Sequence, residues 1–137
     1  MGILDIFKGL RGKKSDGLRV PYKIETRFNP LRLSARRASS VDLILDITNI
    51  SGEDALCSVI VAVPKGLGTD PTGLQRKKEV NVGKIGVNEK KTVTVTIYGT
   101  PMTAAQEYMV GILAYVHFRD YRHVLNSMKR TITLRAV

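Results

Sequence analysis

The chain has 137 residues, with 22 lysines and arginines against 12 aspartates and glutamates, and a formal charge of +10. This length suits one domain that buries a core without cross-links. A single cysteine excludes an intramolecular disulfide framework and fits a reducing compartment. The sequence contains no run of 18 apolar residues, so it predicts no membrane span. The charge is uneven, because +7 of it lies in residues 1–40. A basic block at one end either contacts something negatively charged or only keeps the chain soluble.

Residues 1–17 form the first predicted unit, a short amphipathic helix followed by a flexible basic linker. At about 100° per residue, the apolar side chains share one face: Ile3, Leu4, Ile6, Phe7 and Leu10. Gly12 and Gly17 act as breakers in the linker. A helix of about three turns is marginal alone in water, so it needs a surface to cover its apolar face.

Three interpretations of this unit remain open. In the first, the helix packs on its own domain or frays in solvent. In the second, it anchors the protein on a membrane, with its basic side chains on anionic head groups: Lys8, Arg11, Lys13 and Lys14. In the third, it docks in a groove of a partner protein. A secretory signal is not indicated, because the apolar run is short and the charges follow it.

From residue 22 onward the apolar residues recur with a period of two, which predicts β-strands. We expect seven strands, at residues 22–28, 41–48, 56–63, 79–85, 92–98, 108–118 and 129–137. Pro30 interrupts the first alternation, which resumes at Leu31, Leu33 and Ala35, and indicates a sheet edge or a change of sheet. The strands at 56–63 and 108–118 are apolar on both faces and predict central positions. Residues 64–73, rich in glycine and proline, predict the most mobile loop.

This pattern predicts an all-β fold, an immunoglobulin-like antiparallel β-sandwich of about seven strands over residues 18–137, preceded by the short helix. Tyr108 stands at the mouth of a central strand, shortly after Pro101. That position predicts a tyrosine corner, in which the phenol hydroxyl bonds to backbone upstream.

Residues 41–56, followed by 59–64, resemble the second and third strands of CARDB-like and related immunoglobulin-like modules. The shared features are an alternating strand, an Asn-x-Ser/Gly turn and a strand that ends near proline. Residues 83–95 resemble their later segment of glycine, turn, lysine and alternating strand. The resemblance covers residues 22–137 and implies a non-catalytic interaction or adhesion module. Many such modules are extracytoplasmic, whereas we expect no export signal in this chain. In overall appearance the sequence is similar to small archaeal proteins.

The sequence has few residues of the types that carry catalysis, with two histidines and one cysteine. His117 and His123 lack the spacing of a zinc site, and Cys57 in an apolar strand predicts a buried, inert thiol. Residues 66–73 lack the ending of a phosphate loop. We therefore expect no enzymatic activity, no cofactor and no metal. The densest polar and aromatic cluster predicts a recognition loop: Arg119, Asp120, Tyr121, Arg122 and His123. The alternative is a plain hairpin with a local Arg–Asp pair.

Basic residues recur at turns and strand edges. If they meet on one face, they form a patch for phosphates: Arg36, Arg37, Arg76, Lys77, Lys78, Lys90 and Lys91. Spread apart, they protect strand edges from pairing.

The leading hypothesis is a cytoplasmic, non-enzymatic module that binds a protein partner, with the N-terminal helix as a second contact. Peripheral binding at the inner face of a membrane, contact with nucleic acid or the ribosome, and a homodimer through an edge strand remain alternatives.

Overall fold

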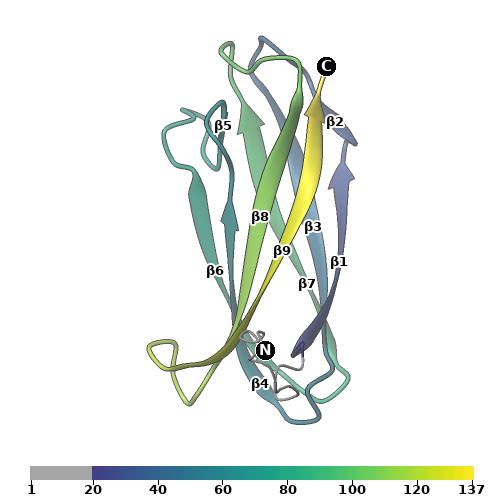
Figure 1. The fold of residues 1–137 in the computed structure, drawn as a ribbon, viewed down its shortest axis with the longest axis vertical. Helices are drawn as coiled ribbons and strands as arrows, with labels where there is room; N and C mark the ends of the chain where they lie inside the picture. The colour runs from purple at the N-terminus through teal and green to yellow at the C-terminus, as the bar shows by residue number, and fades with distance from the viewer. Residues whose placement is uncertain (1–19) are drawn as a thin grey trace, which may run out of the picture.

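The computed structural model describes residues 20–137, which form two β-sheets packed face to face (Figure 1). The four-stranded sheet has the order β1-β3-β7-β5, and its strands are β1 (Tyr22–Asn29), β3 (Ser39–Asn49), β5 (Leu67–Gly68) and β7 (Lys90–Gly99). The five-stranded sheet has the order β2-β9-β8-β4-β6, and its strands are β2 (Arg32–Leu33), β4 (Ala55–Ala62), β6 (Lys77–Ile85), β8 (Glu107–His117) and β9 (Val124–Ala136). No helix occurs within residues 20–137. The helix predicted over residues 1–17 lies outside the described residues.

The seven long strands correspond to the seven predicted ones, and the two-sheet arrangement confirms the predicted β-sandwich. Strands β4 and β8 each have two neighbours, which confirms their predicted central positions. Strand β9 begins at Val124, five residues before the predicted start, because its first residues continue the pairing with β8. Asn126 and Ser127 in this stretch are polar, so they carry no apolar alternation that would reveal a strand.

Pro30 lies between two edge strands of different sheets, which confirms both of its predicted roles. Strand β1 lies at the edge of the four-stranded sheet and β2 at the edge of the five-stranded sheet. The predicted inward alternation after Pro30 is wrong at Leu31, which is 76% exposed, and right at Leu33, which is buried. The reason is that β2 pairs through two residues only, parallel to the end of β9, so the alternation does not extend back to Leu31.

The segment predicted as the most mobile loop, residues 64–73, is anchored at its centre. Leu67 is buried in the core, and β5 pairs with β7 through Leu67 and Gly99. The Thr69 amide also donates a hydrogen bond to the Gln75 carbonyl, at 2.7 Å. A single leucine among glycines and prolines has no period, so sequence patterning misses this anchor.

The core lies between the sheets, and both contribute to it. Its large, fully buried side chains include Tyr22, Leu43, Leu45, Ile97, Ile112 and Leu134. Burying one such apolar side chain contributes about 1.5–3 kcal/mol. Two polar contacts hold β1 against the five-stranded sheet. The Tyr22 hydroxyl donates to the Tyr115 carbonyl at 3.0 Å, and the Arg130 guanidinium donates to the Ile24 carbonyl. Burial also raises the pKa of the Tyr22 phenol.

Tyr108 forms the predicted tyrosine corner. Its hydroxyl donates to the Ala104 carbonyl at 3.0 Å and accepts from the Ala104 amide at 2.9 Å. Gly66 packs against the ring with a φ of +104°, and a Cβ there would lie 3.1 Å from the Tyr108 Cε1 atom. The corner therefore joins the connection before β8 to the mouth of that strand.

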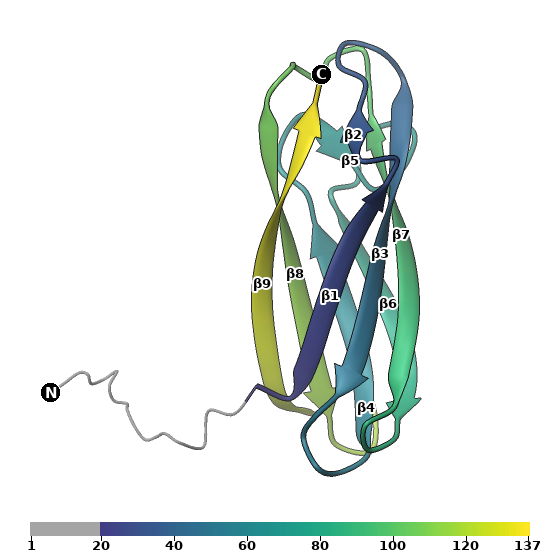
Figure 2. The ribbon, with the colours of Figure 1, turned by 90° about the vertical axis from the view of Figure 1, so that its right-hand side faces the viewer.

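The loops gather at two ends of the elongated sandwich (Figure 2). We call the end at which β1 begins the proximal end. It carries the loops at residues 50–54, 86–89 and 118–123. The distal end carries the loops between β2 and β3 and between β7 and β8, and the C-terminal Val137 lies there (Figure 1).

Candidate functional site

Exposed apolar side chains gather at the proximal end. Of the large apolar side chains exposed within residues 20–137, six lie there: Val20, Ile50, Val87, Phe118, Val124 and Leu125. Leu125 is 64% exposed and Phe118 is 46% exposed. Single exposed apolar residues are normal on a soluble protein, whereas a group of them marks a binding surface.

A half-open cleft of about 770 Å³ lies among these residues. Its apolar lining consists of Pro21, Ala55, Leu56, Val116, Phe118 and Leu125. Charged side chains also line it: Glu53, Asp54, Lys84 and Arg119. Known ligand pockets span about 300–1,000 Å³ and combine an apolar lining with a few polar groups. We call this feature the proximal cleft.

Asn49, which is fully buried, organises one wall of the proximal cleft. Its Nδ2 donates to the Glu53 and Ile85 carbonyls at 2.6 and 2.9 Å. Its Oδ1 accepts from the amide and the hydroxyl of Ser51 at 2.9 and 2.7 Å. One side chain therefore holds the loop at residues 50–54 against the end of β6.

Backbone bonds extend this wall. The Asn88 amide donates to the Asn49 carbonyl at 2.9 Å, and the Asn49 amide donates to the Glu89 carbonyl at 3.0 Å. The Ile50 amide donates to the Pro21 carbonyl at 3.0 Å. The start of the described chain is thereby attached to the rim of the proximal cleft.

Two β-bulges lie beside the cleft. In the pairing of β8 with β9, Val116 pairs with Asn126 and His117 with Val124, so Leu125 is the extra residue. In the pairing of β4 with β6, the register shifts between Cys57 and Ser58. Bulges bend a strand and re-aim its side chains, and they recur beside functional sites. Here one of them leaves Leu125 on the lining of the cleft.

His117 lies against the cleft at the end of β8 and is 7% exposed. Its Nε2 lies 2.6 Å from the Ser58 hydroxyl oxygen, and its Nδ1 has no hydrogen-bond partner within the described residues. The Tyr121 ring packs edge-on against the imidazole, with the ring centroids 5.2 Å apart. Ser58 is fully buried and the Nδ1 atom has no carboxylate beside it, so the pair lacks the geometry of a nucleophilic triad.

The predicted recognition loop closes on itself. The Phe118 amide donates to the His123 carbonyl at 2.8 Å. Asp120 accepts from the Arg122 amide and lies 2.9 Å from the His123 Nδ1 atom. The Arg122 guanidinium lies 3.6 Å from the same carboxylate, so the local Arg–Asp pair named as the alternative is present. The hydrogen bond that the Asp120 carboxylate accepts from the Arg122 amide lowers the pKa of Asp120, and its hydrogen bond with the His123 side chain lowers it further.

Tyr121 and Arg119 complete this loop. Tyr121 covers His117, and the Arg119 guanidinium lies over the Phe118 ring, 4.8 Å from its centroid. The loop therefore presents an apolar ring and a cation together beside the cleft. A recognition role for the loop stays a prediction.

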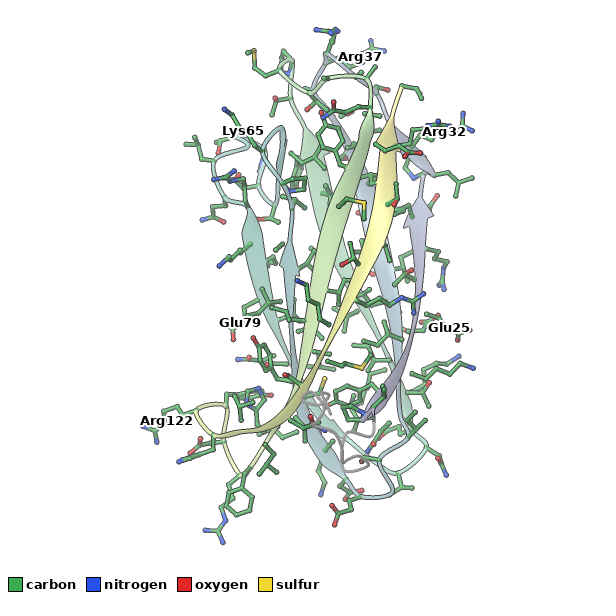
Figure 3. All side chains as sticks on the ribbon, in the orientation of Figure 1. Glu25, Arg32, Arg37, Lys65, Glu79 and Arg122 are labelled. Atoms are coloured by element: carbon green, nitrogen blue, oxygen red, sulfur yellow. The ribbon has the colours of Figure 1, made fainter. Side chains whose placement is uncertain are left out.

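The residues of the predicted basic patch lie apart. Arg36 and Arg37 precede β3 at the distal end, whereas Lys90 and Lys91 open β7 at the proximal end. The remaining three, residues 76–78, lie at the start of the edge strand β6. Figure 3 shows Arg37 and Arg122 at opposite ends of the molecule. These side chains do not form one patch, although Lys77 and Lys78 do lie where they protect an edge.

The predicted contact residues of the N-terminal unit lie outside the described residues: Ile3, Leu4, Ile6, Phe7, Lys8, Leu10, Arg11, Lys13 and Lys14. Cys57 is fully buried, as predicted, and burial raises the pKa of its thiol. Within residues 20–137 no three histidine, cysteine or acidic side chains are grouped to hold a metal ion. No helix in this part of the chain is long and apolar enough to cross a membrane.

Sequence reasoning did not single out Ile50, Val87 or Leu125 as surface contacts. The available signal was that Ile50 and Val87 are lone apolar residues inside turns, and that Leu125, with Val124, lies in an otherwise polar stretch. In such a stretch an apolar side chain has no strand face to join, so exposure is the expected result.

No protein-family model matches this sequence, and no curated protein matches it. Several solved structures share its fold. A fragment of native alpha-2-macroglobulin from Escherichia coli, spanning domain MG7 to the C-terminus, is 15% identical with a TM-score of 0.54. That match covers 84% of this chain and 17% of the fragment, so the chain spans a small part of that protein.

A chain in the complex between zinc 2-glycoprotein and prolactin-inducible protein from human seminal plasma is 14% identical, with a TM-score of 0.54. That match covers 90% of this chain and 100% of the other. The CARDB domain of a Pyrococcus furiosus protein, solved with di-metal ions, is 16% identical over 91% of this chain and 100% of that one, with a TM-score of 0.47. At these identities the two likenesses with a TM-score of 0.54 show the fold alone, an immunoglobulin-like β-sandwich.

Proposed function

We propose that this chain is a non-enzymatic interaction module that binds a partner protein at its proximal end. The observation that carries the proposal is the gathering of exposed apolar side chains around the proximal cleft. Protein interfaces combine an apolar centre with a polar rim. Phe118 and Leu125 supply the centre, and Glu53, Lys84 and Arg119 supply the rim.

The rigidity of this end supports the proposal. Asn49 and its backbone neighbours fix the loops at residues 50–54 and 86–89, and Asp120 fixes the loop at residues 118–123. A preorganised surface loses less conformational entropy when it binds. The fold offers a parallel, because a chain of similar fold is part of the complex between zinc 2-glycoprotein and prolactin-inducible protein.

The non-enzymatic assignment rests on His117 and Ser58. They are the pair of described side chains that comes closest to a nucleophile and its base. Ser58 is fully buried, so a substrate has no access to its hydroxyl. We also propose kinship with CARDB-like modules, on the strength of the sequence resemblance, and a cytoplasmic location, because a single cysteine suits a reducing compartment.

The test compares variants at the two ends of the sandwich. Leu125→Glu places a charge at the centre of the proposed interface, and Met102→Glu places the same charge at the distal end, where Met102 is 86% exposed. Each immobilised full-length variant is used to capture proteins from a lysate of the source cells. We expect a protein that the native chain and Met102→Glu both retain and that Leu125→Glu loses. Equal recovery by all three would reject the proximal end as the docking surface.

A second candidate, peripheral membrane binding, is favoured by one specific observation. The exposed apolar residues of three loops lie at the end where the described chain begins, and residues 1–19, which come before it in the sequence, carry a net charge of +3. An apolar surface beside basic residues suits an anionic lipid surface. Sedimentation with vesicles that contain phosphatidylserine, at low and high salt, tests this candidate. Binding that falls with salt supports it, and no binding at low salt rejects it.

A further inference from the structure

We propose that the outer face of the five-stranded sheet is a contact between two copies of this chain, which pack sheet against sheet around a two-fold axis. The contact is centred on the middle of β4 and β8, away from the loops of the proximal end, so the inference goes beyond the proposed function. In Figure 1 the viewer looks onto this face, with β8 and β9 in front of β3 and β7.

The first observation is that β4 and β8 are apolar on both of their faces. A two-layer sandwich covers one face of each sheet, and here Val59, Val61, Ile112 and Ala114 are completely buried on the covered face. The alternate side chains point out of the sandwich and are half-buried or exposed. Six of these outward side chains are apolar: Leu56, Ile60, Ala62, Met109, Leu113 and Tyr115. Core packing does not account for them, and a group of this kind marks an interaction surface.

The outer face of the four-stranded sheet is different. Its two central strands, β3 and β7, carry mostly polar side chains at the outward positions: Asp42, Asp46, Thr92, Thr94 and Thr96. The Thr92 hydroxyl donates to the Asp46 carboxylate at 2.7 Å, and the Thr96 hydroxyl donates to the Asp42 carboxylate at 2.9 Å. Such alternation of apolar and polar residues is typical of an antiparallel sheet with one face in water. Within one molecule, therefore, the five-stranded sheet has the outer face whose composition suits a covered surface.

The second observation is the order of side chains across this face. The pairing of the strands places Glu79, Ile60, Leu113 and Lys129 in one row across β6, β4, β8 and β9. Two apolar side chains thus lie between an exposed acidic one and an exposed basic one. Neither charged group forms an ion pair with another described residue. Figure 3 shows Glu79 at the edge of the sheet.

This row is complementary to itself under a two-fold rotation. An axis that runs along the strands between β4 and β8 brings Glu79 of one copy near Lys129 of the other, and symmetry repeats the contact. The same rotation brings Ile60 of one copy against Leu113 of the other. Two ion pairs then flank an apolar centre, which is the composition of a protein interface.

The third observation is a glycine in the middle of β8. Gly111 pairs with Ala62 on the outer face, and a Cβ built on it would have only the Ala62 carbonyl oxygen within 4 Å, at a distance of 3.9 Å. Its φ lies outside the left-handed region, so the backbone conformation does not require glycine. Glycine inside a strand recurs where another backbone approaches closely. A second sheet packed on this face would make such an approach.

Edge-to-edge pairing is the competing way to join two copies. The two long edge strands are β6 and β1. Strand β6 begins with Lys77 and Lys78, and lysines on an edge oppose pairing. On β1, the Ile24 carbonyl already accepts from the Arg130 guanidinium of the other sheet. Face-to-face packing leaves both of these edges as they are.

The experiment measures self-association of the full-length chain by sedimentation equilibrium, from about 1 µM to about 1 mM, a range that brackets weak and moderate dimers. Leu113→Lys places a charge at the centre of the proposed contact. Ile44→Lys is the matched control, because Ile44 is half-buried at an outward position of β3 on the other sheet. We expect the native chain and Ile44→Lys to dimerise alike, and Leu113→Lys to raise the dissociation constant at least about tenfold.

Two charge reversals test the two-fold arrangement at exposed positions. Glu79→Lys and Lys129→Glu each bring like charges together at both ends of the row, so each variant alone should dimerise several-fold more weakly. An equimolar mixture of the two variants should associate about as strongly as the native chain, because every lysine of the row then faces a glutamate. Within one copy the two positions lie about 14 Å apart, at three strand spacings of about 4.8 Å. That distance exceeds the screening length of about 8 Å at physiological ionic strength, so the recovery requires a contact between copies.

The outcomes that overturn the proposal are distinct. A native chain that stays monomeric over the whole range would overturn it. A dimer that Leu113→Lys leaves intact would do the same and would point to an edge strand. Equal weakening by Ile44→Lys, or a mixture of the charge variants that associates no better than either alone, would also reject the contact. If Leu113→Lys does not fold, the mixture decides.

Leu125→Glu separates this proposal from the proposed function. It should remain a dimer even where it loses a captured partner, since Leu125 lies in the bulge at the proximal end. If dimers form as described but no captured protein depends on Leu125, the contact between copies stands and the proposed function fails. If the chain is monomeric and a captured protein depends on Leu125, the proposed function stands and the contact between copies is rejected.

Discussion

The hydroxyl oxygen of Ser58 on β4 lies 2.6 Å from the Nε2 atom of His117 on β8. At this point each of the two strands shifts its register against its other neighbour in the sheet. Strand β4 shifts against β6 between Cys57 and Ser58. Strand β8 shifts against β9 between Val116 and His117. The bond thus joins the two central strands β4 and β8 beside the proximal cleft, which His117 lines.

We expect Ser58→Ala to destabilise the protein. The substitution removes the hydroxyl that bonds Nε2, and Nδ1 already has no partner among the described residues, so the buried imidazole loses its hydrogen bond. Leaving a buried polar group unsatisfied costs about 1–3 kcal/mol. Urea unfolding of the native chain and the variant measures this difference.

Ser40→Ala is the matched control, because Ser40 is exposed on β3. It removes the same hydroxyl from the surface and is expected to change the free energy of unfolding by less than about 0.5 kcal/mol. If Ser58→Ala and Ser40→Ala unfold at the same urea concentration, the bond to His117 does not stabilise the fold.

The strands of this fold are readable from the sequence because their side chains alternate between core and solvent. Val41, Leu43, Leu45 and Ile47 all face inward from β3. Such a period is a local property of the chain, so it survives in the sequence. Pro30 and Tyr108 are readable for a related reason, since each has a conformational or hydrogen-bonding role tied to its residue type.

The proximal cleft is not readable in this way. Its walls come from Pro21, Glu53, Val116 and Leu125, which lie far apart in the sequence and meet only because antiparallel strands end together. The exposure of Leu125 depends on a bulge, which is a property of the pairing between two strands and not of either strand alone. The buried position of Leu67 is not readable for a similar reason, because a single inward residue has no period.

Tyr108→Phe is expected to weaken the distal end of the sandwich. The substitution keeps the ring and removes the hydroxyl, which makes two hydrogen bonds with the backbone of Ala104. Each typical hydrogen bond contributes about 0.5–1.5 kcal/mol, so a loss of about 1–3 kcal/mol is expected. The measurement is the free energy of unfolding in urea.

The control for this substitution is Tyr98→Phe. Tyr98 is a half-buried tyrosine of β7, and no hydrogen bond of its hydroxyl is seen among the described residues. It should unfold at nearly the same urea concentration as the native chain. A loss of stability as large as that of Tyr108→Phe would show that the corner makes no special contribution.

Asn49→Ala is expected to loosen the wall of the proximal cleft. It removes four hydrogen bonds of one buried side chain and leaves the Ile85 carbonyl without that donor. Hydrogen exchange followed by mass spectrometry should show faster exchange at residues 50–54. Residues 100–106 at the distal end should exchange as in the native chain. Faster exchange spread evenly over both ends would mean that Asn49 supports the whole sandwich and not this wall.

The loop at residues 118–123 is expected to loosen in acid through Asp120. Hydrogen bonds from the Arg122 amide and from His123 lower the pKa of this carboxyl in the folded chain. A group with a lowered pKa stabilises the fold above its ordinary pKa, about 3.9 for aspartate. That stabilisation is lost as the pH falls through the lower pKa of the folded state, because the carboxylate then binds a proton. The amide signals of Arg122 and His123 in NMR spectra should therefore shift together as the pH falls from about 5 to about 2.

Asp120→Asn identifies the group responsible, since the amide keeps an oxygen that can accept from the Arg122 backbone and loses the titrating charge. In this variant the acid-dependent shift of the Arg122 amide should be absent. Glu25→Gln, an exposed carboxyl on β1, is the control and should leave that shift unchanged. If the Arg122 signal of Asp120→Asn still moves over the same pH range, another group governs the loop. The loop that carries Phe118 and Arg119 at the rim of the cleft would then be held by contacts other than the Asp120 carboxylate.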